Sequence, residues 1–186
     1  MAPESTLSPA DVATRQLTLL RHAQAESHTG PGADFDRALS LVGRRQCHVV
    51  ANRLLEHGVL PQVVLCSAAT RARQTWKLIA SALGEAADDI DVRYLEDLYG
   101  ADAGEVIELV RGLDDDVSSV LVVGHEPVMS AVAHKLAGPH SQESAALRVR
   151  TGISTATLAF LEVHSPWTAL KPRAARLTGL ATAPKD

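Results

Sequence analysis

The chain has 186 residues, of which 46% are hydrophobic and 22% are charged, a balance typical of globular proteins and not of disordered or fibrous ones. A typical domain size of roughly 150 residues predicts one domain with short tails. We expect a flexible tail over residues 1–15, a single domain over 16–181 and a short tail over 182–186. The formal net charge of −4 argues against a nucleic-acid-binding protein, but it allows a small cationic pocket for an anionic substrate.

The sequence contains no targeting signal that we recognise. Residues 1–16 lack the basic segment and apolar run of a secretory signal, and no stretch approaches the roughly 20 apolar residues of a membrane span. The two cysteines, Cys47 and Cys66, are too few for a disulfide framework, and their separation in space is open. We therefore expect a cytoplasmic protein with no membrane partner. No feature of the sequence indicates an oligomeric state.

The first half of the chain alternates predicted strands with predicted helices. A strand over 16–20 precedes a helix over 40–57, for which Ser40 is the expected cap. A strand over 62–65 precedes a helix from about residue 71 to residue 83, with its apolar side chains on one stripe. Both strands are nearly continuous apolar runs, which is typical of strands covered on both faces.

The alternation continues through the middle of the chain. A strand over 90–94 is followed by a helix that begins at Asp102, with Glu105 as its capping-box partner. Another nearly continuous apolar strand covers 119–123, and Pro127 is the expected first residue of the next helix.

The last part of the chain is less regular. Residues 140–145 are predicted to form a loop, residues 154–163 a strand, and part of 167–180 a late edge strand. Strands that alternate with helices predict an α/β protein. We expect a three-layer α/β/α sandwich, with a mostly parallel central sheet and helices on both faces.

Cationic side chains follow three of the predicted strands. Arg21 and His22 come after the first strand, Arg71 after the second, and His125 after the strand over 119–123. Ligands of open α/β sheets bind beyond the carboxyl ends of the strands, so we expect these side chains to share one site. Each motif alone is weak evidence, because short motifs match by chance.

Phosphoryl transfer is the chemistry that suits this set of residues. Arginine binds phosphate oxygens through two parallel hydrogen bonds, and backbone N–H groups at helix starts add further attraction for an anion. A neutral ring nitrogen of His22 can attack phosphorus and carry the phosphoryl group covalently. The neighbouring arginines disfavour its imidazolium form. We expect His125 to be the charged histidine, which donates a hydrogen bond as negative charge develops.

Three segments resemble the motifs of the histidine phosphatase (phosphoglycerate mutase-like) superfamily. Residues 19–23 are similar to its Arg-His signature at a strand end, and residues 65–75 to a second motif with serine, arginine and a Gln-Thr pair. Residues 122–127 resemble the third motif, a Gly-His at a strand end. The motifs occur in the family's order, and the resemblance extends from residue 15 to about residue 163. Together they are specific.

The resemblance implies the fold of that superfamily and a role for each matching residue. It makes His22 the phosphorylated nucleophile and places Arg21, Arg71 and His125 in the phosphate pocket. It implies no metal and no organic cofactor. The expected activity is hydrolysis of a phosphomonoester or a phosphoramidate.

Larger members of the superfamily also use a carboxylic acid to protonate the leaving group. Residues 95–100 resemble the stretch that carries this acid, which points to Glu96, with Asp97 as the second candidate. The short connection from residues 36–40 into a helix is similar to the compact SixA-like branch of phosphohistidine phosphatases. The expected substrate is therefore either a phosphorylated protein, including phosphohistidine, or a small phosphorylated metabolite.

Two alternatives remain at this point. Cys66 lies at a strand end like the nucleophile of a cysteine-based phosphatase, but the arginine that such an enzyme needs after five intervening residues is replaced by Ala72. The same fold could also serve as a phosphate- or phosphoprotein-binding module without catalysis. Among the other histidines, only His28 is a candidate for the rim of the pocket.

Overall fold

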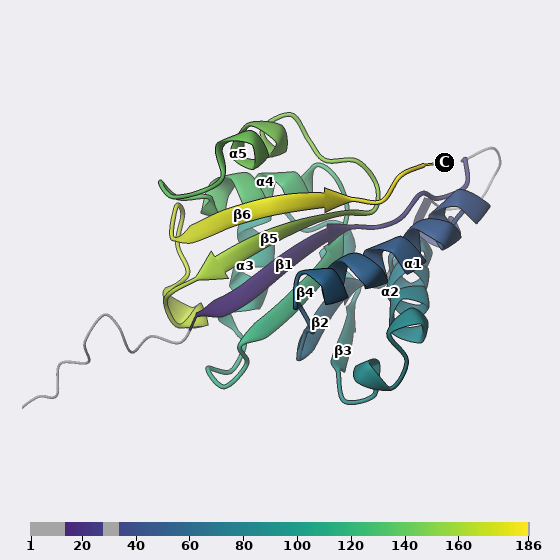
Figure 1. Ribbon diagram of the computed structural model, residues 1–186, viewed down its shortest axis with the longest axis horizontal. Coiled ribbons are helices and arrows are strands. Elements are labelled where there is room, and N and C mark those ends of the chain that lie inside the picture. Colours follow the sequence, from purple (N-terminus) through teal and green to yellow (C-terminus); the bar gives the residue numbers. More distant parts are fainter. Residues whose placement is uncertain (1–13, 28–33, 186) are drawn as a thin grey trace, which may run out of the picture.

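The computed structural model describes residues 14–27 and 34–185, and its strands form one sheet (Figure 1). The strands are β1 (Arg15–Arg21), β2 (Val63–Ser67), β3 (Asp91–Leu95), β4 (Ser119–Gly124), β5 (Thr157–Val163) and β6 (Ala175–Thr182). The α-helices are α1 (Leu41–Glu56), α2 (Thr70–Leu83), α3 (Ala103–Arg111), α4 (Val128–Leu136) and α5 (Glu143–Val149).

The strand order, β3-β2-β4-β1-β5-β6, brings together the ends of three strands that are far apart in the sequence. β4 lies between β1 and β2 and runs parallel to both, whereas β5 pairs antiparallel with β1 on one side and with β6 on the other. Arg21 at the end of β1 lies opposite Gly124 of β4, and Cys66 of β2 lies opposite Val123. The carboxyl ends of β1, β2 and β4 therefore meet at one edge of the sheet.

Helices cover both faces of this sheet, which confirms the predicted three-layer architecture (Figure 1). α1 and α2 pack on one face, and α3, α4 and α5 on the other. Alternate residues of each central strand enter the two cores, since Leu19 and Val122 face α3 and α4 while Leu20 and Val123 face α1 and α2. This double burial explains why these strands read as continuous apolar runs.

The predicted helix caps are confirmed. The Ser40 hydroxyl accepts a hydrogen bond from the backbone N–H of Gly43 at 3.1 Å. Asp102 and Glu105 form the reciprocal capping box at the start of α3. Pro127 immediately precedes α4 and is not its first residue.

The last third of the chain differs most from the prediction. α5 forms across part of the segment predicted as a loop, where only Ala145 and Val149 are buried and leave little apolar periodicity to detect. β5 begins at Thr157 and not at 154, because Ala156 adopts a positive φ of 55° and binds the end of β1 with its N–H.

The packed part of the chain extends beyond the expected boundary at residue 181. β6 ends at Thr182, and Ala183 is buried. The side-chain amide of Gln46 donates to the carbonyls of Ala183 and Pro184. These contacts attach residues 182–184 to α1, in place of the tail that we expected there.

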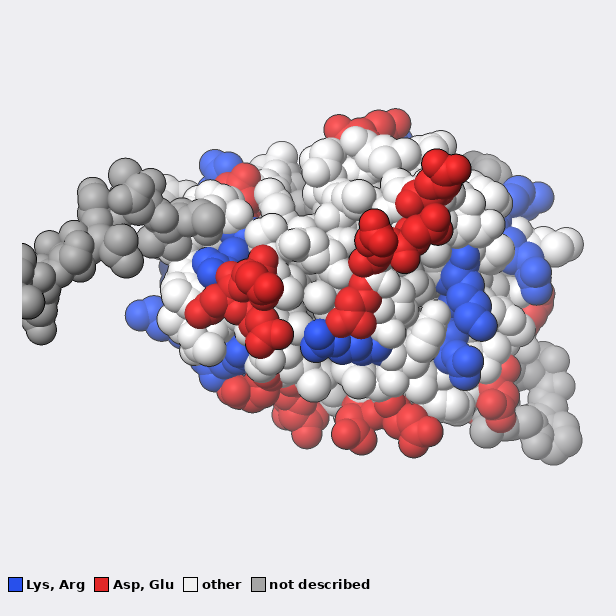
Figure 2. Space-filling view, turned by 90° about the horizontal axis from the view of Figure 1, so that it is seen from below, with Lys and Arg blue, Asp and Glu red and all other residues white. Residues whose placement is uncertain are grey.

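Two further findings concern the apolar character of the helices and the charges on the surface. None of the helices in residues 14–27 and 34–185 combines the length and apolar character that a membrane crossing requires. On the face shown in Figure 2, acidic side chains gather in several groups with basic side chains between them.

Candidate active site

Three of the predicted site residues meet at the shared edge of β1, β2 and β4. Nε of Arg71 donates to Nε2 of His22 at 3.1 Å, and the rings of His22 and His125 have centroids 5.1 Å apart. Arg21 lies close enough for its charge to lower the pKa of both histidines. The strand-end argument therefore correctly brings His22, Arg71 and His125 together, with Arg21 beside them.

The hydrogen bonds of His22 define its tautomer. Nδ1 lies 2.7 Å from the carbonyl oxygen of Ala23, which can only accept, so Nδ1 carries the proton. Nε2 then holds a lone pair and accepts from Arg71. Burial is the main cause that lowers the pKa of His22 to about 3; the Ala23 carbonyl opposes this shift, and His125, Arg71 and Arg21 contribute to it. His22 is thus neutral, with an unprotonated Nε2 in the site.

His125 is held by the end of β2. Its Nε2 lies 2.7 Å from the hydroxyl of Ser67, which also accepts from the N–H of Ala69. Nδ1 of His125 is buried and has no hydrogen-bond partner among the described residues. Burial, followed by the charge of Arg71, lowers the pKa of His125 to about 4. His125 is therefore neutral in the protein without ligand, because burial and the charge of Arg71 outweigh the attraction of Asp34, and its charged state during the reaction stays a prediction.

Asp34, which we did not predict, is the main partner of Arg71. The buried Arg71 guanidinium donates to the backbone carbonyl of Asp34 at 2.7 Å and to Oδ2 of its side chain at 2.9 Å. Tyr99 donates its hydroxyl to the same Oδ2 at 2.8 Å, and Arg37 pairs with Oδ1 at 3.0 Å. The Tyr99 hydrogen bond is the largest of the influences that lower the pKa of Asp34. Asp34 follows no strand, so the strand-end argument could not find it.

Tyr99 forms one wall of the site. Its ring lies edge-on to His125 with centroids 5.3 Å apart, and the guanidinium carbon of Arg71 lies 5.7 Å from its centroid. The segment over residues 95–100 was selected in the sequence for its acidic residues, but the residue of this segment that contacts His125 and Arg71 is Tyr99.

Glu96 and Asp97 lie elsewhere on the same segment. Both are exposed and line a cleft of about 960 Å³ together with acidic residues of α3. Within the described parts of the chain, no hydrogen bond or ion pair joins either carboxylate to His22, Arg71 or His125. Their role in protonating a leaving group stays a prediction. His28, the candidate for the pocket rim, lies outside the described residues.

Arg21 points toward a neighbouring segment. Its Nη1 donates to the carbonyl of Ile153 at 2.7 Å, and its Nε is buried without a partner among residues 14–27 and 34–185. Glu126, next to His125, accepts from the N–H of Ile153 at 2.7 Å and from the N–H of Ser130 at 3.3 Å. Glu126 thereby holds the backbone at Ile153, whose carbonyl accepts the hydrogen bond from Arg21.

Cys66 does not have the properties of a catalytic thiol. It is fully buried in β2, and burial raises the pKa of its thiol to about 12. The thiolate is the nucleophilic form of cysteine, and the buried surroundings of Cys66 disfavour the thiolate. Cys47 is likewise buried, and both cysteines are free.

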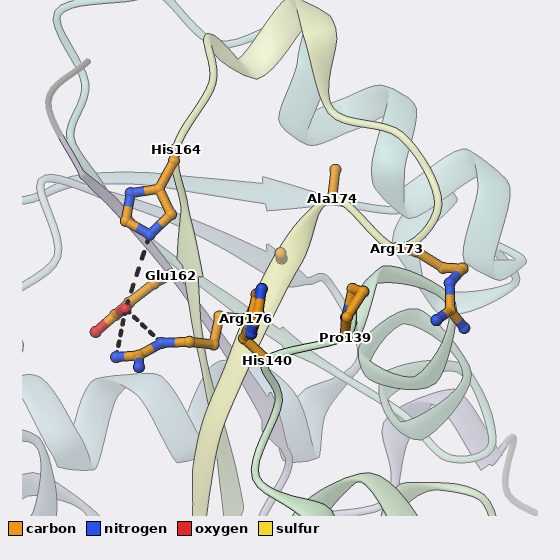
Figure 3. Close-up of a pocket in the computed structure, with 9 residues that line it drawn as sticks. Pro139, His140, Glu162, His164, Arg173, Ala174 and Arg176 are labelled. Atoms are coloured by element: carbon orange, nitrogen blue, oxygen red, sulfur yellow. Dashed lines mark hydrogen bonds and ion pairs between the residues drawn. The ribbon is translucent and has the colours of Figure 1, made fainter. Parts of the chain in front are cut away.

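A separate surface pocket of about 510 Å³ lies where β5 ends and β6 begins (Figure 3). Glu162 in this pocket pairs with Arg176 at 2.8 Å and lies 4.0 Å from Nε2 of His164. Val163, at the end of β5, pairs with Arg15 at the start of β1. The pocket is therefore at the opposite edge of the sheet from His22.

Comparisons with known proteins agree with the fold and with the motifs. The family model described as the histidine phosphatase superfamily (branch 1) matches residues 17–111. The chain is 38% identical over 161 residues to an uncharacterized protein of Mycobacterium tuberculosis (Rv1276c), and the match covers 86% of this chain and 97% of that protein. It is 30% identical over 138 residues to an uncharacterized chloroplastic protein of Arabidopsis thaliana, covering 70% of this chain and 63% of that one.

The solved structures extend the agreement to three dimensions. A protein of Nakamurella multipartitia, provisionally assigned as phosphohistidine phosphatase SixA, is 30% identical with a TM-score of 0.79, over 92% of this chain and 97% of its own. The protein histidine phosphatase SixA in complex with tungstate shares the fold, with a TM-score of 0.72 at 21% identity, over 90% and 97% of the two chains. Motifs, family model, relatives and fold agree: this chain belongs to the histidine phosphatase superfamily.

Proposed function

We propose that the protein is a phosphatase that hydrolyses a phosphoramidate or a phosphomonoester through a covalent phosphohistidine on His22. The observation that carries this proposal is the unprotonated Nε2 of the buried His22, 3.1 Å from the guanidinium of Arg71. A lone pair beside a buried cation suits attack on the phosphorus of a group bound by that cation.

The first chemical step forms a bond between Nε2 of His22 and phosphorus. The bond from phosphorus to the leaving nitrogen or oxygen breaks, and its electron pair departs with the leaving group. A water molecule then attacks the phosphorus of phosphohistidine, the bond from phosphorus to Nε2 breaks, and its electron pair returns to Nε2. The attacking water loses a proton to solvent, and the products are inorganic phosphate and free His22. The proton on Nδ1, held by the Ala23 carbonyl, keeps the ring oriented through both steps.

The phosphoryl oxygens bind to Arg21, Arg71 and His125 in this proposal. A phosphate dianion favours the protonated form of a nearby histidine, since opposite charges stabilise each other. His125 therefore gains its proton when substrate binds and donates to a phosphoryl oxygen, while Ser67 holds the other ring nitrogen. The burial that keeps His125 neutral in the free protein makes this proton uptake depend on substrate.

Protein phosphohistidine is the substrate class that we favour. The compact SixA structures cover almost the whole chain, and the relative at 30% identity is provisionally assigned as a phosphohistidine phosphatase. The second candidate is a phosphate-binding module without catalysis. It predicts saturable phosphate binding and no release of phosphate from any substrate.

One experiment separates these possibilities. We would test a phosphohistidine peptide and a panel of phosphomonoesters with the wild-type chain, His22→Ala and Cys66→Ser. The proposal predicts that His22→Ala abolishes turnover, that Cys66→Ser retains it, and that mass spectrometry without acid treatment finds phosphate on His22. Turnover that survives in His22→Ala, or that is lost only in Cys66→Ser, would overturn the proposal.

A further inference from the structure

A second cationic pocket, of about 340 Å³, adjoins the site at Arg21. Arg148 and Lys185 line it with Arg21, together with the hydroxyl-bearing residues Thr151, Ser154 and Thr155. We infer that this pocket binds a carboxylate of the substrate, next to the phosphoryl group that is transferred. The inference deepens the proposed phosphatase function and rests on it.

The cations of this pocket come from three distant parts of the chain. Arg21 ends β1, Arg148 belongs to α5, and Lys185 follows β6. Among the described residues, neither Arg148 nor Lys185 has a carboxylate within ion-pair distance. Like charges that converge without carboxylate partners favour an anion in the space between them.

Glu126 is the one carboxylate in the pocket lining, and backbone groups occupy both of its oxygens. Oε1 accepts from the N–H of Ile153 at 2.7 Å, and Oε2 accepts from the N–H of Ser130 at 3.3 Å. Gly152 has a φ of 98°, and a side chain there would begin 3.1 Å from Oε1. Glu126 therefore shapes the loop, and the cations still outnumber the carboxylates lining the pocket.

Two buried polar atoms on the pocket lining lack partners. Nε of Arg21 and Oγ1 of Thr155 form no hydrogen bond within the described structure. Buried polar atoms in native proteins are nearly always hydrogen-bonded, so these two atoms have hydrogen-bonding capacity that the free protein does not use. Both atoms are shielded from solvent in the free protein, so a bound anion contacts either of them only after that side chain turns toward the pocket.

The pocket is coupled to the catalytic residues through the backbone. The N–H of Ala156 binds the carbonyls of both Arg21 and His22 at 3.1 Å, which joins the loop to the end of β1. Arg21 thus contributes to both places, with its charge acting on His22 and its side chain lining the second pocket. A substrate with two nearby anionic groups can occupy both at once.

The test compares substrates that differ only in the second anion. We would measure kcat/KM for phenyl phosphate and for the three carboxyphenyl phosphate isomers, and for phosphohistidine peptides with Glu or Gln beside the phosphohistidine. The first set represents small metabolites and the second represents proteins. The inference predicts that at least one added carboxylate raises kcat/KM about tenfold, which corresponds to about 1.4 kcal/mol.

Charge removal in the pocket identifies where this preference arises. Arg148→Gln and Lys185→Gln are expected to remove most of the preference and to change phenyl phosphate turnover less than twofold. Arg150→Gln is the matched control, because Arg150 is an exposed cation at the end of α5 that is not part of the pocket lining. The Arg150→Gln variant is expected to show the same preference for an added carboxylate as the wild-type chain.

Phosphonate analogues separate the inference from the proposed function. Calorimetry would compare phenylphosphonate with the carboxyphenylphosphonates, which bind without turnover. A binding preference that Arg148→Gln removes supports the inference even if no substrate is hydrolysed, and in that case the proposed function alone fails. If no carboxylate improves kcat/KM or binding, or if Arg150→Gln reduces the preference as much as Arg148→Gln does, the inference is overturned.

Discussion

Nη2 of Arg71 lies 2.9 Å from Oδ2 of Asp34, so the guanidinium proposed to bind phosphate already holds a carboxylate. Tyr99 and Arg37 add a hydrogen bond and an ion pair to that carboxylate. A phosphate dianion and Asp34 need the same donors on Arg71. The protein without ligand therefore stabilises its buried cation with an internal anion that substrate must displace or rearrange.

Removal of the Asp34 charge is expected to strengthen phosphate binding. The pKa of Asp34 is lowered, so its carboxylate is ionised at neutral pH and Asp34→Asn removes a full charge. We expect the inhibition constant of inorganic phosphate to fall roughly threefold to tenfold, which corresponds to about 0.7–1.4 kcal/mol. Asp36→Asn, in the same short helical turn, is the control and should leave the constant unchanged. Weaker inhibition in Asp34→Asn would show that Asp34 assists binding.

The buried histidines are expected to make the protein less stable in acid. The pKa of His22 is about 3 in the folded chain, against about 6.5 when unfolded, so between these values only the unfolded state takes up the proton. The free energy of unfolding therefore falls as pH falls, and His22 accounts for roughly 2 kcal/mol between pH 7 and pH 5. Urea denaturation should show a shallower pH dependence for His22→Asn. His48→Asn, at an exposed position of α1, should keep the wild-type slope.

Ser67 is expected to act by holding His125. Ser67→Ala leaves the buried Nε2 of His125 without its 2.7 Å partner, which should cost about 1–3 kcal/mol of stability and lower kcat about tenfold with a smaller change in KM. Ser130→Ala is the matched control, because this buried serine donates to the Pro127 carbonyl away from the reacting groups. The Ser130→Ala variant loses this hydrogen bond, so it should be less stable than the wild-type chain and have the same kcat. Equal kcat values for the two variants would remove Ser67 from the proposed mechanism.

Gly43 is expected to be required by the loop that follows His22. A Cβ at Gly43 would lie 2.0 Å from the carbonyl oxygen of Gln24, so the loop must move when a side chain is added. Gly43→Ala should destabilise the protein by about 1–3 kcal/mol and reduce kcat/KM. Thermal unfolding and steady-state kinetics would measure both effects. Gly112→Ala, where the nearest atom is 3.6 Å away, should change neither by a comparable amount.

The leaving group determines whether an acid is needed. A phosphoramidate nitrogen leaves readily, whereas an alkoxide requires a proton, so Glu96→Gln should slow phosphomonoester hydrolysis and barely slow phosphohistidine hydrolysis. Asp97→Asn tests the second candidate, and Glu108→Gln is a control within the same acidic cleft. Equal losses on both substrates would contradict the acid role of Glu96. No loss on either substrate would show that Glu96 does not protonate the leaving group.

The site residues at the strand ends could be predicted for two reasons. The apolar run that identifies each strand is a local sequence pattern, and parallel strands of any α/β sheet end at the same edge. Continuous apolar runs identify β1, β2 and β4, and parallel strands end at the same edge of a sheet, so Arg21, His22, Arg71 and His125 had to converge. Ser40 and Asp102 were predictable for a similar reason, since a helix cap depends on only a few neighbouring residues.

The remaining features depend on contacts between segments that have no common sequence signature. Asp34 and Tyr99 are 65 residues apart and meet through side chains of two short 3-10 helices, which are too short to show an apolar periodicity. The protonation state of His125 depends on how deeply it is buried, and no motif encodes that depth. The second pocket joins Arg148 and Lys185 to Arg21 only because the fold brings α5 and the residues that follow β6 close to the end of β1.

The central position of β4 also constrains when the sheet can assemble during synthesis of the chain. β1 and β2 have no direct pairing in the sheet and are joined through β4, which is the last of the three to be synthesised. A nascent chain that has been synthesised only as far as residue 111 contains both flanking strands but lacks the strand inserted between them. We therefore expect such a fragment to remain unassembled, and a proteolytic cut between α3 and β4 to destroy the reaction centre even though it removes none of its side chains.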